Sequence, residues 1–488
     1  MNESIVSQTV RGVKWNSIGT IVVNVLQMLK LFILARILSK SDFGLIAIAL
    51  MVIGFADIFA GLGLASGLIH QQRVSREQYS SVFWVNLLLG VFFYLLLVLC
   101  SPLIAAYYHQ PLLTRVLPIL GLVLITSSFG KMFNVFKMKE LDFKFISLVE
   151  ITGVAAGFAL TVVLALCGFG VFSLVYGTLL QSLLIFGTYA VSGFRRYRIL
   201  FRLRVSEIRP LLRIGVFQFS TQTVDYAAGK LDVFIIGRFF SAEVLGVYNL
   251  SKELLQKIVQ LISTIVTKVG SPAFARFQHD MPKMRDAYGR VLTVLASINM
   301  PVFFAIAVFA DLLVPLLYGG AMVEMVWFVR IFSVWALFQS VFSSSDILVV
   351  SLGRTDLGFI WTLIRISLTL VVTVVACRFS IETMAWSQAL LAAAFFFAYW
   401  RLMVYRMIRM PLSHYLHAVA HPFLMAAASA FVAIPVVLLS YRISWGCWLR
   451  WGALALFGCA YLLLFWLTRR DYVRQIQSQL FRSRTSTK

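Results

Sequence analysis

Charged and amide side chains recur at helical spacing inside an apolar stretch near the start of this sequence. Asn16, Thr20, Gln27 and Lys30 are separated by four, seven and three residues, which places them on one face of a helix. If that face met lipid, burying the lysine charge would be strongly unfavourable. We therefore expect the face to line a water-filled path, or to form a structural seam in which amides join neighbouring helices.

A second polar face of the same kind follows 202 residues later in the sequence. It contains Gln222, Asp225 and Asp232, and Lys230 is a further charge inside the same apolar segment. Because the offset aligns Lys30 with Asp232, we expect these two groups to lie at similar depth and to approach each other in one conformation. Ionised groups at equivalent positions favour a water-filled cavity over a structural seam.

The segment from residue 246 to residue 270 has the broadest polar face. Its members include Lys257, Gln260 and Thr264, and Lys252 lies nearby. Glu253 precedes Lys257 by one helical turn, so the two can pair. A wall of ammonium, amide and hydroxyl groups suits an anionic ligand that accepts hydrogen bonds. Lys257 is too far from the ends of its segment to reach the interface easily, and we predict that it contacts the anionic part of that ligand.

Asp57, Arg330 and Arg365 are further ionisable residues inside apolar segments, and we add them to the candidate pathway. The two arginines can bind phosphate through paired hydrogen bonds or can pair with nearby acids. Asp57 or Asp232 is the expected carboxylate if a proton or sodium gradient drives the process. The five cysteines are scattered and have no CxxC spacing, so we expect no metal site, disulfide framework or other cofactor.

The apolar segments that must position these side chains are long. Hydrophobic residues make up 60% of the 488-residue chain, charged residues make up 13%, and the mean hydropathy is +0.88. Runs of about 20 apolar residues are long enough to span a bilayer. We predict an all-α polytopic membrane protein. Its fourteen spanning helices are expected at residues 14–37, 44–69, 79–100, 113–136, 147–167, 171–194, 211–237, 246–270, 287–316, 322–350, 357–377, 383–404, 419–440 and 446–468.

The net charge of +23 lies mainly in short segments between these apolar runs. Such a charge can indicate nucleic-acid binding in a soluble protein. Here most Lys and Arg residues follow the even-numbered spans or lie near the termini, which is the positive-inside pattern. We therefore expect no nucleic-acid partner and two cytoplasmic termini. The polar opening MNESIVSQTVRGVKW has no small-residue cleavage site, so we expect no removable signal peptide.

One short phrase occurs twice, each time after an apolar run. ARILSKSDFG at 35–44 and GRFFSAEVLG at 237–246 share Arg, Ser and Gly at the offset of 202 residues. The offset spans six helices, an even number, so the two halves would be parallel repeats. We predict an N-terminal lobe at 1–194, a basic cytoplasmic linker at 195–210, a C-terminal lobe at 211–404, two additional helices within 405–468 and a basic cytoplasmic tail at 469–488.

Five segments of the chain carry a family resemblance. They are GVKWNSIGT, ARILSKSDFGL, GLGLASGLIHQ, KLDVFIIGRFFSAEVLGVYNLS and SPAFARFQHD. The chain resembles the polysaccharide flippases of the multidrug/oligosaccharidyl-lipid/polysaccharide exporter superfamily, and most of all the colanic acid and teichuronic acid exporter branch. The similarity extends over at least residues 11–410. That branch commonly has Asp-Phe-Gly where this chain has Ala60-Gly61-Leu62-Gly63.

The resemblance implies a two-lobed helical bundle in the bacterial plasma (inner) membrane that works by alternating access. It implies a polyprenyl-diphosphate-linked oligosaccharide as cargo, moved from the cytoplasmic to the outer leaflet. The product would be an exopolysaccharide, an O-antigen or a teichuronic acid-type polymer. Membrane lipids, a polysaccharide polymerase and export machinery would be the partners.

Two other functions stay open at this point. A multidrug exporter of the same superfamily would usually carry a cationic cargo, which fits poorly with the basic face around Lys257. A membrane polysaccharide polymerase or ligase would need a sizeable exposed loop or a close pair of catalytic acids, and the connections between the predicted spans are short. We therefore expect a transporter rather than an enzyme.

Overall fold

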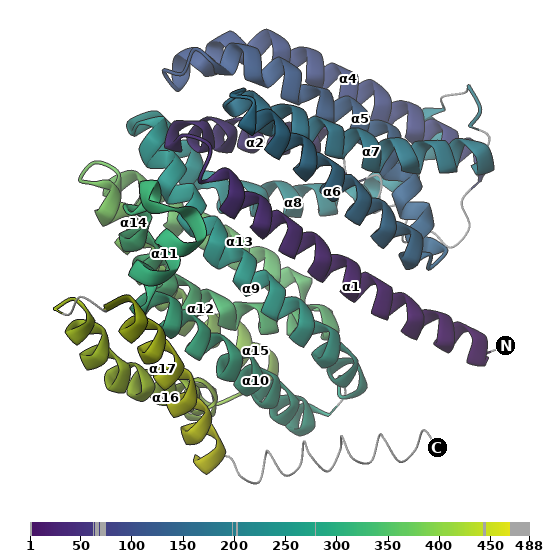
Figure 1. Ribbon diagram of the computed structural model, residues 1–488. Coiled ribbons are helices and arrows are strands. Elements are labelled where there is room, and N and C mark those ends of the chain that lie inside the picture. Colours follow the sequence, from purple (N-terminus) through teal and green to yellow (C-terminus); the bar gives the residue numbers. More distant parts are fainter. Residues whose placement is uncertain are drawn as a thin grey trace. The chain divides into compact units, whose positions relative to one another are not determined.

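The chain folds almost entirely into helices (Figure 1). The computed structural model describes residues 2–61, 63, 68, 75–197, 199–201, 204–278, 280–442 and 446–468, and these contain no β-strand. The predicted all-α class is therefore confirmed. The predicted tail at 469–488, and residues 198, 202 and 203 of the predicted linker, lie outside the described residues.

The helices vary widely in length. The α-helices are α1 (Asn2–Leu34), α2 (Lys40–Gly61), α4 (Arg76–Tyr107), α5 (Leu113–Lys139), α6 (Phe143–Leu166), α7 (Val171–Tyr197), α8 (Val205–Phe239), α9 (Ala242–Arg276), α10 (Met281–Val308), α11 (Ala310–Tyr318), α12 (Met325–Ser351), α13 (Thr355–Ala376), α14 (Ile381–Tyr399), α15 (Tyr405–Ile408), α16 (Leu412–Ser440) and α17 (Gly446–Thr468). A 3-10 helix, η1 (Gly320–Met322), and a π-helix, η2 (Trp400–Val404), complete the set.

Within the described part of the chain, 12 helical segments are long and apolar enough to cross a membrane. The protein is therefore a multi-pass membrane protein. Helices α8 and α9, of 35 residues each, are outside this set. Charged side chains are spread along both helices and lower their hydropathy. These two helices carry two of the three polar faces that the sequence singles out.

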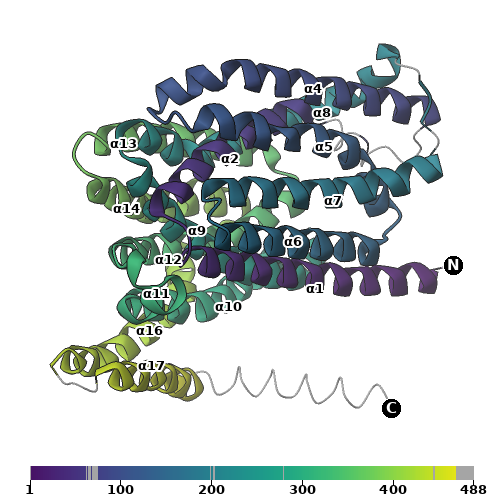
Figure 2. The same cartoon turned by 45° about the horizontal axis from the view of Figure 1, so that its top comes forward.

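The described residues form two compact units, of which the first comprises Met1–Lys257, Leu317–Met325 and Thr362–Ser387. In this unit α4 packs on α5, α5 on α7 and α7 on α6, and α1 runs along α6 (Figures 1 and 2). Its core cluster is rich in aromatic side chains, including Phe83 and Tyr189, which are at most 1% exposed. Helix α8 packs against α2 and α4.

Local sequence explains where several helices of the first unit begin and end. At the start of α4, Gln78 N donates to Ser75 Oγ and Ser75 N donates to Gln78 Oε1, both at 3.1 Å. Asp142 caps α6 by accepting a hydrogen bond from Phe145 N at 3.3 Å. The short turn from α6 to α7 uses Gly168 at a φ of 82°, a conformation that glycine adopts without strain.

The second unit comprises the described residues of Ile258–Leu316, Val326–Trp361 and Gln388–Lys488. Here α16 packs on both α10 and α17, and α16 and α17 form a helical hairpin (Figure 1). Tyr461 Oη donates to Ser297 O at 2.8 Å, which ties α17 to α10. The three helices therefore form one packed group.

Helix α10 of the second unit begins with a charged cap. Asp280 accepts a hydrogen bond from Lys283 N at 3.1 Å, and the Lys283 ammonium lies 2.8 Å from the same carboxyl group. The side-chain hydrogen bond from Lys283, with a further backbone hydrogen bond, lowers the pKa of Asp280. The pair is exposed, and surface pairs of this kind add little to stability.

The predicted span at 287–316 is two helices in the structure, so that part of the prediction is wrong. Helix α10 ends at Val308 because Phe309, with φ −101° and ψ 21°, leaves helical geometry. Phe309 O then accepts a hydrogen bond from Leu313 N at 2.9 Å and starts α11. Apolar periodicity continues through this break, which is why the sequence does not reveal it.

The serines of the repeated phrase have the same role in both copies. Ser39 Oγ accepts a hydrogen bond from Asp42 N at 3.2 Å at the start of α2. Ser241 Oγ accepts a hydrogen bond from Val244 N at 3.3 Å at the start of α9. Each serine therefore caps the helix that follows it.

The glycines of the repeated phrase also have matching roles, and they bring the two copies into contact. A Cβ atom on Gly44 would lie 1.9 Å from Ala242 O, and one on Gly246 would lie 2.0 Å from Lys40 O. Lys40 and Ala242 are themselves equivalent at the offset of 202 residues. Each glycine thus lets its helix approach the first residue of the helix in the other copy.

We predict that Gly44→Ala and Gly246→Ala each destabilise the protein. The added Cβ would overlap a backbone oxygen, so α2 and α9 would have to separate, at a cost of about 1–3 kcal/mol. Gly187→Ala in α7 is a matched control, because nothing lies within 4 Å of its added Cβ. The thermal unfolding midpoint of the detergent-solubilised protein should fall for the first two variants and not for the control. Unchanged midpoints for both would contradict this contact.

Candidate functional site

Asp232 is the most enclosed of the predicted pathway acids. It lies on α8, its side chain is 3% exposed, and it forms an ion pair with the Lys252 ammonium of α9. Tyr248 Oη donates to Asp232 Oδ2 at 3.2 Å, and Val233 N donates to Asp232 Oδ1 at 2.9 Å. Both carboxylate oxygens are therefore hydrogen-bonded, as a buried charge requires.

Lys257 joins two of the predicted polar faces. Its ammonium on α9 donates a hydrogen bond to Gln27 Oε1 on α1. Gln27 is a neutral amide, so this hydrogen bond brings no negative charge to the Lys257 ammonium. The sequence predicted that Glu253 could pair with Lys257, but in the structure the Lys257 ammonium bonds to Gln27 instead.

The polar faces of α1 and α9 thus meet within the first unit, through the hydrogen bond from Lys257 to Gln27. In this structure Asp232 pairs with Lys252, and the approach of Lys30 to Asp232 stays a prediction for another conformation. The sequence did not single out Tyr248, although its spacing of four residues from Lys252 places both on one face of α9.

The other predicted members on α1 and α8 are more accessible. Thr20 Oγ1 donates to Asn16 O at 2.7 Å within α1, and the Asn16 side chain is exposed. Gln222 is exposed and Lys230 is half-buried on α8. Asp225 of α8 accepts a hydrogen bond from Arg365 Nη2 of α13 at 3.2 Å. Of the two options left open for Arg365, the structure contains the acid pair.

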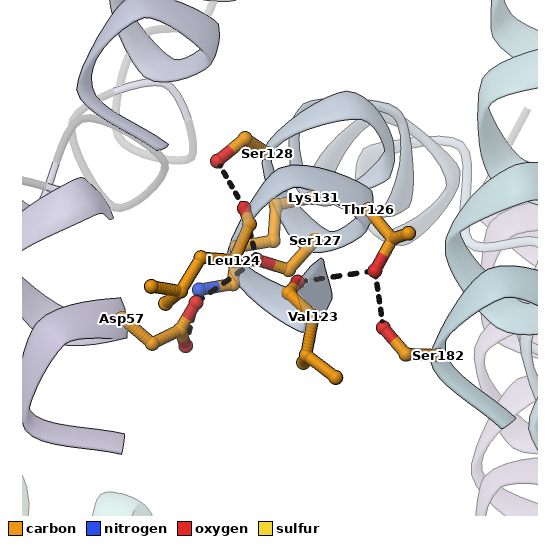
Figure 3. A network of polar contacts seen from close by, with 8 residues as sticks. All are labelled: Asp57, Val123, Leu124, Thr126, Ser127, Ser128, Lys131 and Ser182. Carbon is orange, nitrogen blue, oxygen red and sulfur yellow. Dashed lines mark hydrogen bonds and ion pairs between the residues drawn. The ribbon is translucent and has the colours of Figure 1, made fainter. Parts of the chain in front are cut away.

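Asp57 is part of a polar network between α2 and α5 (Figure 3). Lys131 Nζ lies 2.6 Å from Asp57 Oδ2, and Ser127 Oγ donates to Asp57 Oδ1 at 2.9 Å. The side chains of Asp57 and Lys131 are 31% and 32% exposed. Lys131 was not among the predicted site residues, although an ionisable residue inside the apolar segment at 113–136 was a usable signal.

Three predicted members, Gln260, Thr264 and Arg330, belong to the second unit. Arg330 Nη2 forms an ion pair with Asp311 Oδ1 at 2.6 Å. Thr264 Oγ1 donates to Gln260 O at 2.7 Å within α9, and the Gln260 side chain is exposed. Arg330 therefore pairs with an acid, as the sequence allowed. This pair belongs to the second unit, whereas Lys252 and Asp232 belong to the first.

The charged groups of the first unit suit an anion better than a multivalent metal ion. Among the described residues, no group of three or more His, Cys, Asp or Glu side chains could bind one. Around the junction of α1 and α9, Lys252 pairs with Asp232, whereas the Lys257 ammonium bonds to the neutral amide of Gln27. The Lys257 ammonium therefore has no carboxylate in its hydrogen bond and suits an anion.

Comparison with known proteins identifies the family of the chain. A family model described as "Polysaccharide biosynthesis protein" matches residues 33–327. The chain belongs to this family. The match confirms the resemblance drawn from the repeated phrase and the segments around it.

Three relatives are similar in sequence to this chain over most of its length. The lipopolysaccharide biosynthesis protein WzxC of Escherichia coli (strain K12) is 28% identical over 359 residues, 73% of this chain and 72% of its own length. The teichuronic acid biosynthesis protein TuaB of Bacillus subtilis (strain 168) is 26% identical over 442 residues, 89% and 90% of the two lengths. The succinoglycan biosynthesis transport protein ExoT of Rhizobium meliloti (strain 1021) is 26% identical over 322 residues, 66% and 65%.

Two solved structures show a similar fold. The lipid II flippase MurJ in an inward closed conformation has a TM-score of 0.77 at 13% identity, covering 94% of this chain and 99% of its own. An inward-facing multidrug resistance MATE family transporter of the MOP superfamily has a TM-score of 0.62 at 15% identity, covering 79% and 98%. At these identities the likeness concerns the fold alone.

We predict that Asp232→Asn strongly destabilises the protein. The enclosed Lys252 ammonium would then lose the carboxylate of this ion pair, and breaking a buried pair costs about 3–5 kcal/mol. The double variant Asp232→Asn, Lys252→Met removes both charges and should recover part of the loss. Unfolding midpoints and the amount of folded protein in the membrane measure both effects.

The exposed pair Asp280–Lys283 supplies the control for this double-mutant cycle of Asp232 and Lys252. Asp280→Asn with Lys283→Met should leave the unfolding midpoint nearly unchanged, because exposed pairs contribute little. If the Asp232, Lys252 double variant were less stable than the sum of its single variants, a direct favourable pair would be excluded.

Proposed function

We propose that this chain is a flippase that moves a polyprenyl-diphosphate-linked oligosaccharide across the bacterial plasma membrane by alternating access. The polymer made from these units is an exopolysaccharide, an O-antigen or a teichuronic acid-type polymer. Support comes from the family, from relatives named for polysaccharide biosynthesis, and from the fold shared with a lipid II flippase. A polysaccharide polymerase and export machinery would act on the translocated unit.

The observation that carries this proposal is the neutral partner of Lys257. If α9 crosses the membrane, the Lys257 ammonium is more stable with a negatively charged partner. The Gln27 amide supplies only a hydrogen bond. A diphosphate supplies both the charge and strong acceptor oxygens. The neighbouring amide and hydroxyl groups of the polar faces can bond the sugar, while the lipid chain stays in the bilayer.

The Lys257 ammonium can bond either to the Gln27 amide or to the diphosphate of the cargo. When the site is empty, Gln27 holds the ammonium between α1 and α9. A diphosphate competes for the same ammonium and releases the amide, because hydrogen bonds between charged groups are the stronger ones. Binding of cargo therefore changes the contact between α1 and α9, which links cargo to conformation.

The topology that fits this function has fourteen spans. They are the 12 apolar segments found among the described residues and, in addition, α8 and α9. Six spans form each lobe and two are additional, as the offset of 202 residues implies. The distribution of Lys and Arg supports a cytoplasmic location for both termini. Charged side chains along α8 and α9 are tolerated if they face a hydrated path rather than lipid.

Energy coupling is assigned to the Asp57 network in this proposal. Asp57 accepts hydrogen bonds from Lys131 and Ser127, so its protonation would release the Lys131 ammonium (Figure 3). A sodium ion could replace that ammonium on the same carboxylate. Either event changes the contact between α2 and α5, which makes proton or sodium coupling through Asp57 chemically reasonable.

The two alternative functions fit less well. The similarity to a multidrug transporter concerns the fold, while the family match is to polysaccharide biosynthesis proteins. The relatives and structural neighbours named for an activity are transporters or flippases rather than enzymes. We therefore assign the chain to the transporters.

We predict that Lys257→Ala abolishes or sharply reduces export, because the cargo loses its charged partner. Lys257→Arg should retain part of the activity, since it keeps the charge but changes the shape. The measurement is surface polysaccharide in a strain that lacks the chromosomal copy and carries each variant, with membrane protein quantified alongside.

Lys283→Ala is the matched control, because it removes an exposed lysine from α10 and should leave export unchanged. Full export by the Lys257→Ala variant at a normal protein level would contradict the proposed role. Lys257 would then only join α1 and α9.

A further inference from the structure

A second basic site lies in the second unit, at one end of three packed helices. A pocket of about 540 Å³ opens between the start of α10, the start of α16 and the end of α17. Its cationic and histidine side chains are Arg285, Arg290, His414, His417 and His421. This volume is within the range of about 300–1,000 Å³ that small ligands occupy.

The lining of this pocket suits an anion. The two arginines outnumber its one acid, Asp286, so the pocket is positive even with neutral histidines. His414, His417 and His421 recur at three- and four-residue spacing, so they share one face of α16. An imidazole can donate a hydrogen bond in either charge state.

The direction of α16 adds to this preference. Helix α16 begins at Leu412, two residues before His414 of the pocket, so the positive end of its dipole lies beside the pocket. Arg285 is partly engaged already, because its Nε and Nη2 donate to Ile408 O at 3.2 and 3.1 Å. Arg290 and the histidines are therefore the better candidates for contact with a ligand.

The pocket lies at the ends of candidate membrane spans and next to apolar surface. Met281–Val308 and Leu412–Ser440 are two of these spans. On α16, Leu424 is 64% exposed and follows His421 by less than one turn, and on α17, Trp466 is 50% exposed just before Thr468 of the pocket. Tryptophan at such a position is typical of the membrane–water interface.

We propose that this pocket binds the phosphodiester headgroup of an anionic phospholipid, whose acyl chains lie against the adjoining apolar surface of α16 and α17. The headgroup phosphate accepts hydrogen bonds from Arg290 and His417. The apolar neighbours distinguish a lipid from a free phosphate ion, which shares the headgroup chemistry but gains nothing from that surface. The site is separate from the Lys257 network, and the proposal does not depend on the cargo.

The test measures lipid binding rather than transport. Purified delipidated protein is titrated with phosphatidylglycerol, and the first bound lipid is quantified by native mass spectrometry. We expect the Arg290→Gln, His417→Gln double variant to bind phosphatidylglycerol about tenfold more weakly, as for the loss of a charged hydrogen bond. Arg290→Lys should retain part of the affinity. Phosphatidylcholine, whose choline cation offsets the phosphate charge, should bind the wild type more weakly than phosphatidylglycerol does.

Lys283→Gln is the control on the same helix, because Lys283 does not line the pocket and its side chain is 66% exposed. Equal phosphatidylglycerol binding by wild type and double variant, at equal unfolding midpoints, would overturn the proposal. So would an equal loss in the Lys283→Gln control. Displacement of the lipid by millimolar inorganic phosphate would identify a free-phosphate site instead. Export is not the readout, so this test can fail while the flippase assignment holds.

Discussion

The hydrogen bond from the Lys257 ammonium to the Gln27 amide is the interaction on which the proposed function depends. It joins α1 to α9 and leaves a positive charge without a carboxylate in that bond. Asp232 is different, because its carboxylate accepts hydrogen bonds from Lys252, Tyr248 and the backbone N–H of Val233. A closed pair of this kind stabilises the structure, whereas a charge bonded to a neutral group is ready to accept an anion.

The repeated phrase explains how the helices that carry these charges are held. Its serines cap α2 and α9, and its glycines let the same two helices touch at their first turns. The contact is made by backbone atoms, so it requires residues without side chains rather than any particular chemistry. A duplicated sequence has thereby produced a pair of matching contacts close to the start of the helix that bears Lys252 and Lys257.

The sequence predicted well what depends on local composition. Long apolar runs and helical polar spacing gave the all-α membrane class and the faces of α1, α8 and α9. It could not choose partners between helices: Lys257 bonds to Gln27, 230 residues away, and not to the neighbouring Glu253 that helical spacing favours. Likewise Asp57 was found as an isolated acid, while Lys131 and Ser127 were recognised only once α2 and α5 were packed. Spacing along one helix says nothing about which side chain of another helix faces it.

Translocation by the purified protein tests the central claim most directly. The wild-type chain is reconstituted into vesicles that carry a polyprenyl-diphosphate-linked oligosaccharide, and the sugar in the outer leaflet is followed with a membrane-impermeant sugar oxidant. The account predicts that protein-containing vesicles move the lipid-linked sugar between leaflets much faster than protein-free vesicles do under the same ion gradient. Equal rates in the two kinds of vesicle, with folded protein present, would contradict it.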